Sequence, residues 1–157
     1  MPDIFLDGGA RHLLVLHACA AIVLIGATTH HAIIAWGYLR GTHKQRLGRI
    51  YAATIAITYV ITFGFGLLVY PTFRYHTRAL FLDRYDRWAS NLFDMKENFA
   101  ALGLPLVLGM LLLSRAMSSK DDRHLVGGYV AMAWTTAFIV WFDVISGLVI
   151  TNVRGVP

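Results

Sequence analysis

Residues 13–39, LLVLHACAAIVLIGATTHHAIIAWGYL, decide the fold that the sequence predicts. The stretch runs for about 27 residues without a formally charged side chain, and about 20 apolar residues are enough for a helix to cross a bilayer. Three histidines interrupt it, His17, His30 and His31. Ionisable groups are costly at membrane depth, so they usually face the protein interior and mark a functional site.

Composition supports the same reading. The chain of 157 residues is 57% hydrophobic and 15% charged, with a mean hydropathy of +0.56, whereas soluble domains average about 25% charged residues. The net charge of +5 would suggest nucleic acid in a soluble protein. In a membrane protein it is explained by cytoplasmic loops and anionic lipid. We therefore expect the lipid bilayer as a partner and no nucleic acid.

Further apolar runs predict an all-α integral membrane protein, a single membrane domain over residues 1–157. Four transmembrane helices are expected in an antiparallel bundle, at about 13–39, 50–70, 98–117 and 125–151. Pro71 is expected to end the second span. Residues 71–97 are too long for a bare loop in a compact bundle, and their aromatic and basic side chains predict short helices at the membrane interface.

Lysine and arginine set the expected orientation. Four of them fall in the short segment 40–49, and more surround the polar turn at 118–124. Short basic loops favour the cytoplasm. Both termini and the 71–97 connection are then expected to face outward, and we expect a bacterial inner membrane.

Two of the three histidines share one helix face. His17 and His31 are 14 positions apart, which is about 40° short of four full turns and a rise of about 21 Å. His30 points about 100° away from His31. This spacing resembles that of the di-haem cytochrome b proteins, in which two histidines on one membrane helix each ligate a different haem. The resemblance implies haem b, with His17 and His31 as ligands of the iron.

A polar cluster is expected near the outer surface, from His17, His76, Glu97 and Asp143. In one interpretation His17 and His76 ligate a haem, and Asp143 accepts the imidazole N–H. In another, His17 and Asp143 bind a quinone head group or relay a proton, with Glu97 nearby. The plainer alternative is that His17 and Asp143 satisfy each other in the bundle core.

A second histidine group is expected deeper in the membrane. His30 and His31 follow Thr28 and Thr29, and the candidate haem partner is His124 at the start of the last span. A homodimer would instead bring His31 to a second His31. The plainer alternative is that these side chains bond to neighbouring helix backbones or line a subunit interface.

Three classes of function remain open. The first is a small membrane subunit of an electron-transfer, respiratory-type assembly that binds haem b or a quinone. The second is a cofactor-free structural or assembly subunit, which the lack of a second histidine pair favours. The third is a small transporter coupled to protons or metal ions. No Walker loop, nucleophile elbow or HExxH motif points to an enzyme, and we expect no catalytic residue.

Overall fold

The computed structural model describes residues 5–42, 44–117 and 123–155, without the side chains of residues 123 and 124. All regular structure in these ranges is helical, and no strand occurs in them. The four long helices are α1 (Ala10–Leu39), α2 (Gln45–Thr72), α4 (Arg87–Ala116) and α5 (Arg123–Val153). Each is long and apolar enough to cross a membrane. The predicted all-α chain with four such helices is confirmed.

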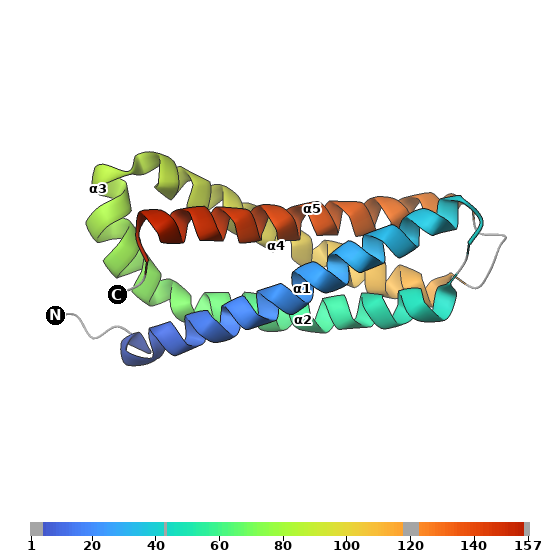
Figure 1. The fold of residues 1–157 in the computed structure, drawn as a ribbon, viewed down its shortest axis with the longest axis horizontal. Helices are drawn as coiled ribbons and strands as arrows, with labels where there is room; N and C mark the ends of the chain where they lie inside the picture. Colours follow the sequence, from blue (N-terminus) through green and yellow to red (C-terminus); the bar gives the residue numbers. More distant parts are fainter. Residues whose placement is uncertain (1–4, 43, 118–122, 156–157) are drawn as a thin grey trace.

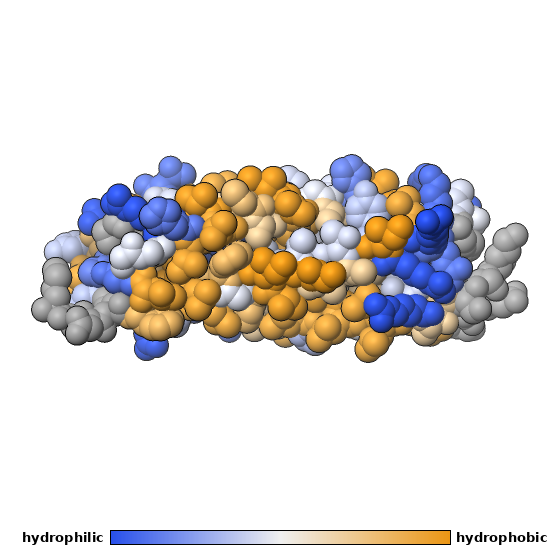
Figure 2. Space-filling model, turned by 90° about the horizontal axis from the view of Figure 1, so that it is seen from below, coloured by the Kyte–Doolittle hydropathy of each residue, from blue (hydrophilic) through white to orange (hydrophobic). Residues whose placement is uncertain are grey.

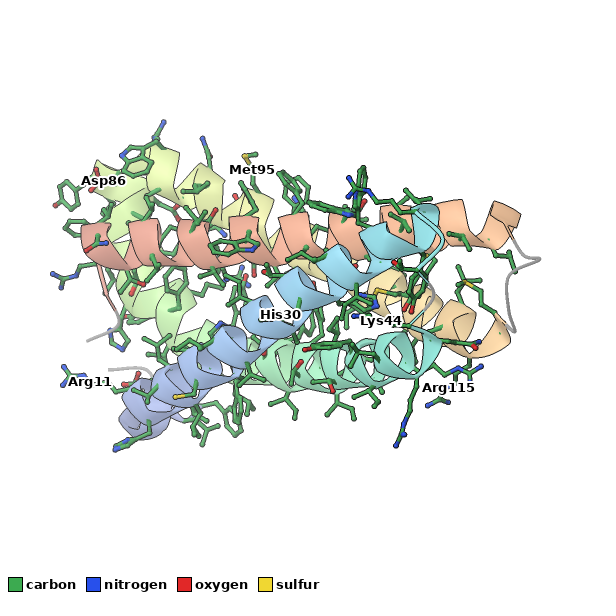
Figure 3. All side chains as sticks on the ribbon, turned by 45° about the vertical axis from the view of Figure 1, so that its right-hand side comes forward. Arg11, His30, Lys44, Asp86, Met95 and Arg115 are labelled. Carbon is green, nitrogen blue, oxygen red and sulfur yellow. The ribbon has the colours of Figure 1, made fainter. Side chains whose placement is uncertain are left out.

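Successive long helices run in opposite directions along one bundle axis (Figure 1). Helix α1 packs against α2 and α5, and α4 packs against the same two helices. Both termini and the short helix α3 (Asp83–Tyr85) lie at one end, here called the terminal end. The α1–α2 connection lies at the opposite end, here called the loop end. Helices α1 and α5 are close near the loop end and diverge toward the terminal end in Figures 1 and 3.

The face of the bundle drawn in Figure 2 is banded. On this face apolar side chains cover the middle and polar ones gather toward both ends. Large exposed side chains such as Ile22, Ile57 and Leu112 are more than half exposed, whereas Tyr129 and Ile55 lie inside at 1% and 0%. Figure 3 places Arg11 and Asp86 toward the terminal end and Lys44 and Arg115 toward the loop end. This distribution is consistent with an integral membrane protein.

The connection between α2 and α4 differs from the expectation. The helix does not end at Pro71 but reaches Thr72 and continues as a π-helix, η2 (Phe73–Leu82). Proline lacks the N–H that would bond one turn back, and neighbouring helices make this tolerable in a membrane helix. The wider turns of η2 follow, as in the bond from the Asp83 N–H to the Arg78 carbonyl.

Helix α4 likewise begins well before residue 98. It starts at Arg87, so residues 87–97 of the expected interfacial segment are the first part of a long helix. Side-chain hydrogen bonds hold η2 and α3 against the start of α4. The Arg78 guanidinium donates to both Asp94 carboxylate oxygens at 2.7 and 3.0 Å, and Ser90 donates to Asp83. Such a forked pair fixes direction as well as distance. The predicted turn at 118–124 falls largely outside the described residues.

The close packing of α2 against α4 depends on Gly103. The Tyr59 hydroxyl lies where a Cβ on Gly103 would be, and it donates to the Ala100 carbonyl at 2.8 Å. Gly103→Ala should displace this tyrosine and lower the free energy of unfolding by about 1–3 kcal/mol. Denaturant titration in detergent micelles measures the change.

The matched control is Gly109→Ala on the same helix. Its added Cβ would make ordinary contacts of 3.6 and 3.7 Å with Met132. Because alanine has a higher helix propensity than glycine, Gly109→Ala should raise the free energy of unfolding by up to about 1 kcal/mol. Equal effects of the two substitutions would contradict this packing.

Candidate functional site

The four long helices each contribute one polar side chain to a cluster in the apolar part of the bundle. We call it the four-helix polar cluster: His17 from α1, Tyr59 from α2, Lys96 from α4 and Asp143 from α5. By helix rise, His17, Lys96 and Asp143 lie about 10, 14 and 15 Å from those ends of their helices that meet at the terminal end. The three groups therefore share a similar depth.

His17 is oriented by the backbone of α2. Its Nδ1 lies 2.8 Å from the Thr62 carbonyl oxygen. A carbonyl can only accept, so Nδ1 carries the hydrogen and Nε2 is left as an acceptor. Gly66 lies beside the ring, and a Cβ there would be 3.4 Å from His17 Cε1, at ordinary van der Waals contact. The expected bond from the imidazole N–H to Asp143 is thus replaced by one to a main-chain oxygen.

Lys96 brings a positive charge to the cluster. Its Cε lies 3.5 Å from the position of a Cβ on Gly147, so the side chain reaches across from α4 to α5, one helical turn from Asp143. Its ammonium lies 5.9 Å from the centre of the Phe93 ring. Lys96 interacts electrostatically with both His17 and Asp143. It is the shared neighbour of these two residues, whose helices diverge at this end of the bundle.

Asp143 has unused hydrogen-bonding capacity. Its Oδ1 is buried and has no hydrogen-bond partner within the described part of the chain. No ion pair within 4 Å joins it to a basic side chain among the same residues. Tyr59, which interacts with Asp143 electrostatically, gives its own hydrogen to the Ala100 carbonyl. A buried carboxyl oxygen without a donor is rare in native proteins and calls for a ligand or water.

Two residues expected in this cluster are held elsewhere. His76 lies on η2 with its Nε2 3.4 Å from an Asp7 carboxylate oxygen near the start of the chain. The structure thus gives His17 and His76 different partners. Glu97 is half-buried beside Lys96, within electrostatic range of Arg78 and Asp94, and so connects the cluster to the corner at η2.

The deeper histidines separate as their spacing predicted. His31 is 1% exposed, with Nε2 2.7 Å from the Tyr129 hydroxyl and its ring against Tyr51 and Tyr129. His30 is exposed and bonds to the Gly26 carbonyl of its own helix at 2.9 Å. His124 lies in the first turn of α5, and its side chain is outside the described residues.

Ligation of haem iron fits these two environments differently. His17 has the arrangement that metal-binding histidines use, with one ring nitrogen held by a carbonyl and the other available. The Nε2 of His31 is taken by Tyr129, and the ring is enclosed by aromatic side chains. Within the described residues, no three His, Cys, Asp or Glu side chains gather as a metal site. The geometry therefore favours His17 over His31 as a coordinating residue.

Lys96, Tyr59 and Tyr129 were missed by sequence reasoning. The predicted third span begins at residue 98, which places Lys96 in the connection before it. One signal was available: Lys96, Ala100, Gly103, Val107 and Met110 follow one another at helical spacing of three or four residues. The last three are buried, which places Lys96 on the inward face of α4.

The state of His17 provides a direct test of this site. Nitrogen-15 solid-state NMR of the protein in lipid should show the tautomer that is protonated on Nδ1. Gly66→Val should weaken the bond to the Thr62 carbonyl, because the methyl groups extend from a Cβ that already contacts the ring at 3.4 Å. Gly64→Val is the control on the same helix, since nothing lies within 4 Å of a Cβ there. A native His17 protonated only on Nε2 would contradict the geometry.

Comparison with known proteins leaves the site to be interpreted from its own chemistry. No protein-family model matches the chain, and neither does a curated protein or a solved structure. The site is therefore described by the residues that the fold brings together, which are a histidine, a lysine, a tyrosine and an aspartate in an apolar bundle.

Proposed function

We propose that this chain is an integral membrane subunit of an electron-transfer, respiratory-type assembly, and that its four-helix polar cluster binds a quinone head group. One observation carries the proposal. His17 with an acceptor nitrogen, Lys96 with its ammonium and Asp143 with an unpartnered oxygen lie at a similar depth by helix rise, in the apolar part of the bundle. Intramembrane ionisable groups of this kind mark functional sites.

The residue types suit quinone chemistry. Reduction of a quinone to a quinol takes up two electrons and two protons, and it places negative charge on the carbonyl oxygens as the electrons arrive. Lys96 can donate a hydrogen bond to one oxygen, where a positive charge stabilises the developing anion. Asp143 and His17 can exchange protons with the head group. The electrons come from a redox group of a partner membrane subunit, and the apolar quinone tail lies in lipid.

Orientation follows from the basic side chains. We place the loop end, with Arg40, Lys44, Arg46 and Arg49, on the cytoplasmic side of a bacterial inner membrane. The termini and the corner formed by η2 and α3 then face outward. The cluster lies nearer the outward face in this arrangement.

Haem b is the second candidate, favoured by the His17 hydrogen bond to the Thr62 carbonyl. His17 would hold a haem through its available Nε2, whereas His76 is paired with Asp7 and the Nε2 of His31 with Tyr129. Haem supplies one-electron redox chemistry when bound. This chain's part would be to hold the imidazole in one tautomer.

Quinone titration of the purified protein in nanodiscs tests the first candidate. Ubiquinone and menaquinone analogues should bind, and Asp143→Asn and Lys96→Gln should each weaken binding about tenfold or more, because a hydrogen bond to a charged group contributes about 1.5–3 kcal/mol. His30→Gln, an exposed histidine on α1, is the matched control and should bind as the native protein does. Unchanged affinity in both cluster variants would overturn the proposed quinone site.

An optical spectrum of the same preparation separates the remaining candidates. Near-stoichiometric haem with a reduced α-band that is lost in His17→Ala and kept in His76→Ala would favour the haem site. A colourless, folded protein that binds no quinone would instead support a cofactor-free structural subunit.

A further inference from the structure

Unpartnered polar atoms are not scattered through this bundle. Among the described residues, four buried side-chain atoms lack a hydrogen-bond partner. Three of them lie on α1 and α5: Nδ1 of His31, Oγ1 of Thr136 and Oδ1 of Asp143. His31 and Thr136 are each 1% exposed. Most buried polar groups in proteins have a partner, so three exceptions on two adjacent helices indicate a shared cause.

The spacing of these residues places them in one file. Tyr129, Thr136 and Asp143 follow one another on α5 at intervals of seven residues. Each interval turns the helix about 20° short of two full turns and advances it about 10.5 Å. The three side chains therefore share a face of α5, and the same spacing relates His17, Leu24 and His31 on α1.

Three contacts join the two helices, which run antiparallel. They are the His31–Tyr129 hydrogen bond of 2.7 Å, the Trp141–Thr29 hydrogen bond of 3.0 Å and the ring contact of Trp36 with Trp134. Counted along α5 from the His31–Tyr129 contact, Thr136 lies about 10.5 Å and Asp143 about 21 Å closer to the terminal end.

We infer that a file of water molecules along this face of α5 carries protons from the loop end to Asp143, an inference that rests on the proposed function because the cluster is where the protons are used. The gaps of about 10.5 Å between levels are too long for direct hydrogen bonds, and a buried water needs two to four polar partners. His31, Thr136 and Asp143 supply such partners at successive levels.

Proton transfer along this file conserves atoms and charge. His31 can accept a proton on one ring nitrogen and release one from the other, returning to neutral imidazole. The Thr136 hydroxyl can accept one hydrogen bond and donate another. Asp143 receives the proton at the end of the file. The charged and titratable neighbours it faces there are Lys96 from α4 and Tyr59 from α2, with His17 beyond Lys96.

The entrance is built from tyrosines near the loop end. The Tyr129 hydroxyl is 3.5 Å from the Gly48 carbonyl, and the Tyr129 ring stacks on Tyr38 with 5.8 Å between ring centroids. Tyr38 donates to the carbonyl of the exposed Lys44 at 3.1 Å. A Cβ on Gly48 would overlap the Tyr38 hydroxyl. Polar groups thus lead from the exposed loop to His31.

Surface-enhanced infrared spectroscopy tests the path from one side. The full chain is tethered to gold through a C-terminal tag and surrounded by a bilayer, so that the loop end faces the bulk solution, without added quinone. After a pH jump in the bulk, the carboxyl C=O band of Asp143, assigned with Asp143→Asn, reports its protonation. Thr136→Val and His31→Phe should slow this step about tenfold, a rise of about 1.4 kcal/mol in the barrier.

The chain offers matched controls for both variants. Thr135→Val and His30→Phe change the same residue types one position away, where the side chains are exposed, and should leave the rate unchanged. Equal rates in the native protein, Thr136→Val and His31→Phe would overturn the path. If a path variant does not fold, water-edited NMR of the native protein decides: water contact at Thr136 supports the file, and a dry Thr136 overturns it.

The two proposals fail in different ways. If quinone binding is intact but the protonation rate of Asp143 does not depend on Thr136, only the proton path is overturned. If the protonation rate of Asp143 depends on Thr136 but the protein binds no quinone, only the quinone site is overturned.

Discussion

The His31–Tyr129 hydrogen bond is the constraint on which the interior of this bundle depends. It is fully buried and joins the first long helix to the last. In an apolar bundle, a buried polar group without a partner costs about 1–3 kcal/mol, so this pair favours one register of α1 against α5 over its neighbours. The Trp141–Thr29 hydrogen bond and the Trp36–Trp134 ring contact join the same two helices, and the three contacts together hold α1 against α5.

Small residues let the other helices close around this pair. Gly48 leaves space for the Tyr38 hydroxyl and Gly103 for the Tyr59 hydroxyl, and Gly66 lies beside the His17 ring. In each case a glycine on one helix accommodates a polar aromatic or imidazole side chain of another. Without a hydrophobic driving force between helices in lipid, such close approach and interhelical hydrogen bonding hold a membrane bundle together. The same glycines therefore shape both the packing and the polar interior.

Sequence reasoning found the helices more readily than their contacts. Apolar runs of sufficient length predicted all four long helices, because length and hydropathy are local properties. The prediction that the second span ends at Pro71 was wrong, because a membrane helix tolerates proline and this one continues into η2. The predicted third span also starts too late, at residue 98 rather than at Arg87, because charged residues such as Lys96 and Asp94 are not expected inside an apolar span.

Much of the candidate site was beyond local reasoning. The shared face of His17 and His31 followed from helix geometry, and so did the separate direction of His30. The partners did not, because the pairing of His31 with Tyr129 and of His76 with Asp7 depends on interhelical register, which a single sequence does not encode locally. Lys96 reaches the cluster only because its flexible side chain extends to α5 at Gly147.

The most direct test of this account is the distance between His31 and Tyr129 in a lipid bilayer. Solid-state NMR with nitrogen-15 histidine and carbon-13 labels on the tyrosine rings can measure it, with Tyr129→Phe to assign the signal. A hydrogen-bonded contact that matches the 2.7 Å between His31 Nε2 and the Tyr129 hydroxyl oxygen would support the polar seam between α1 and α5. Absence of dipolar coupling between the two side chains would contradict this contact between α1 and α5, and with it the entrance of the proposed proton path.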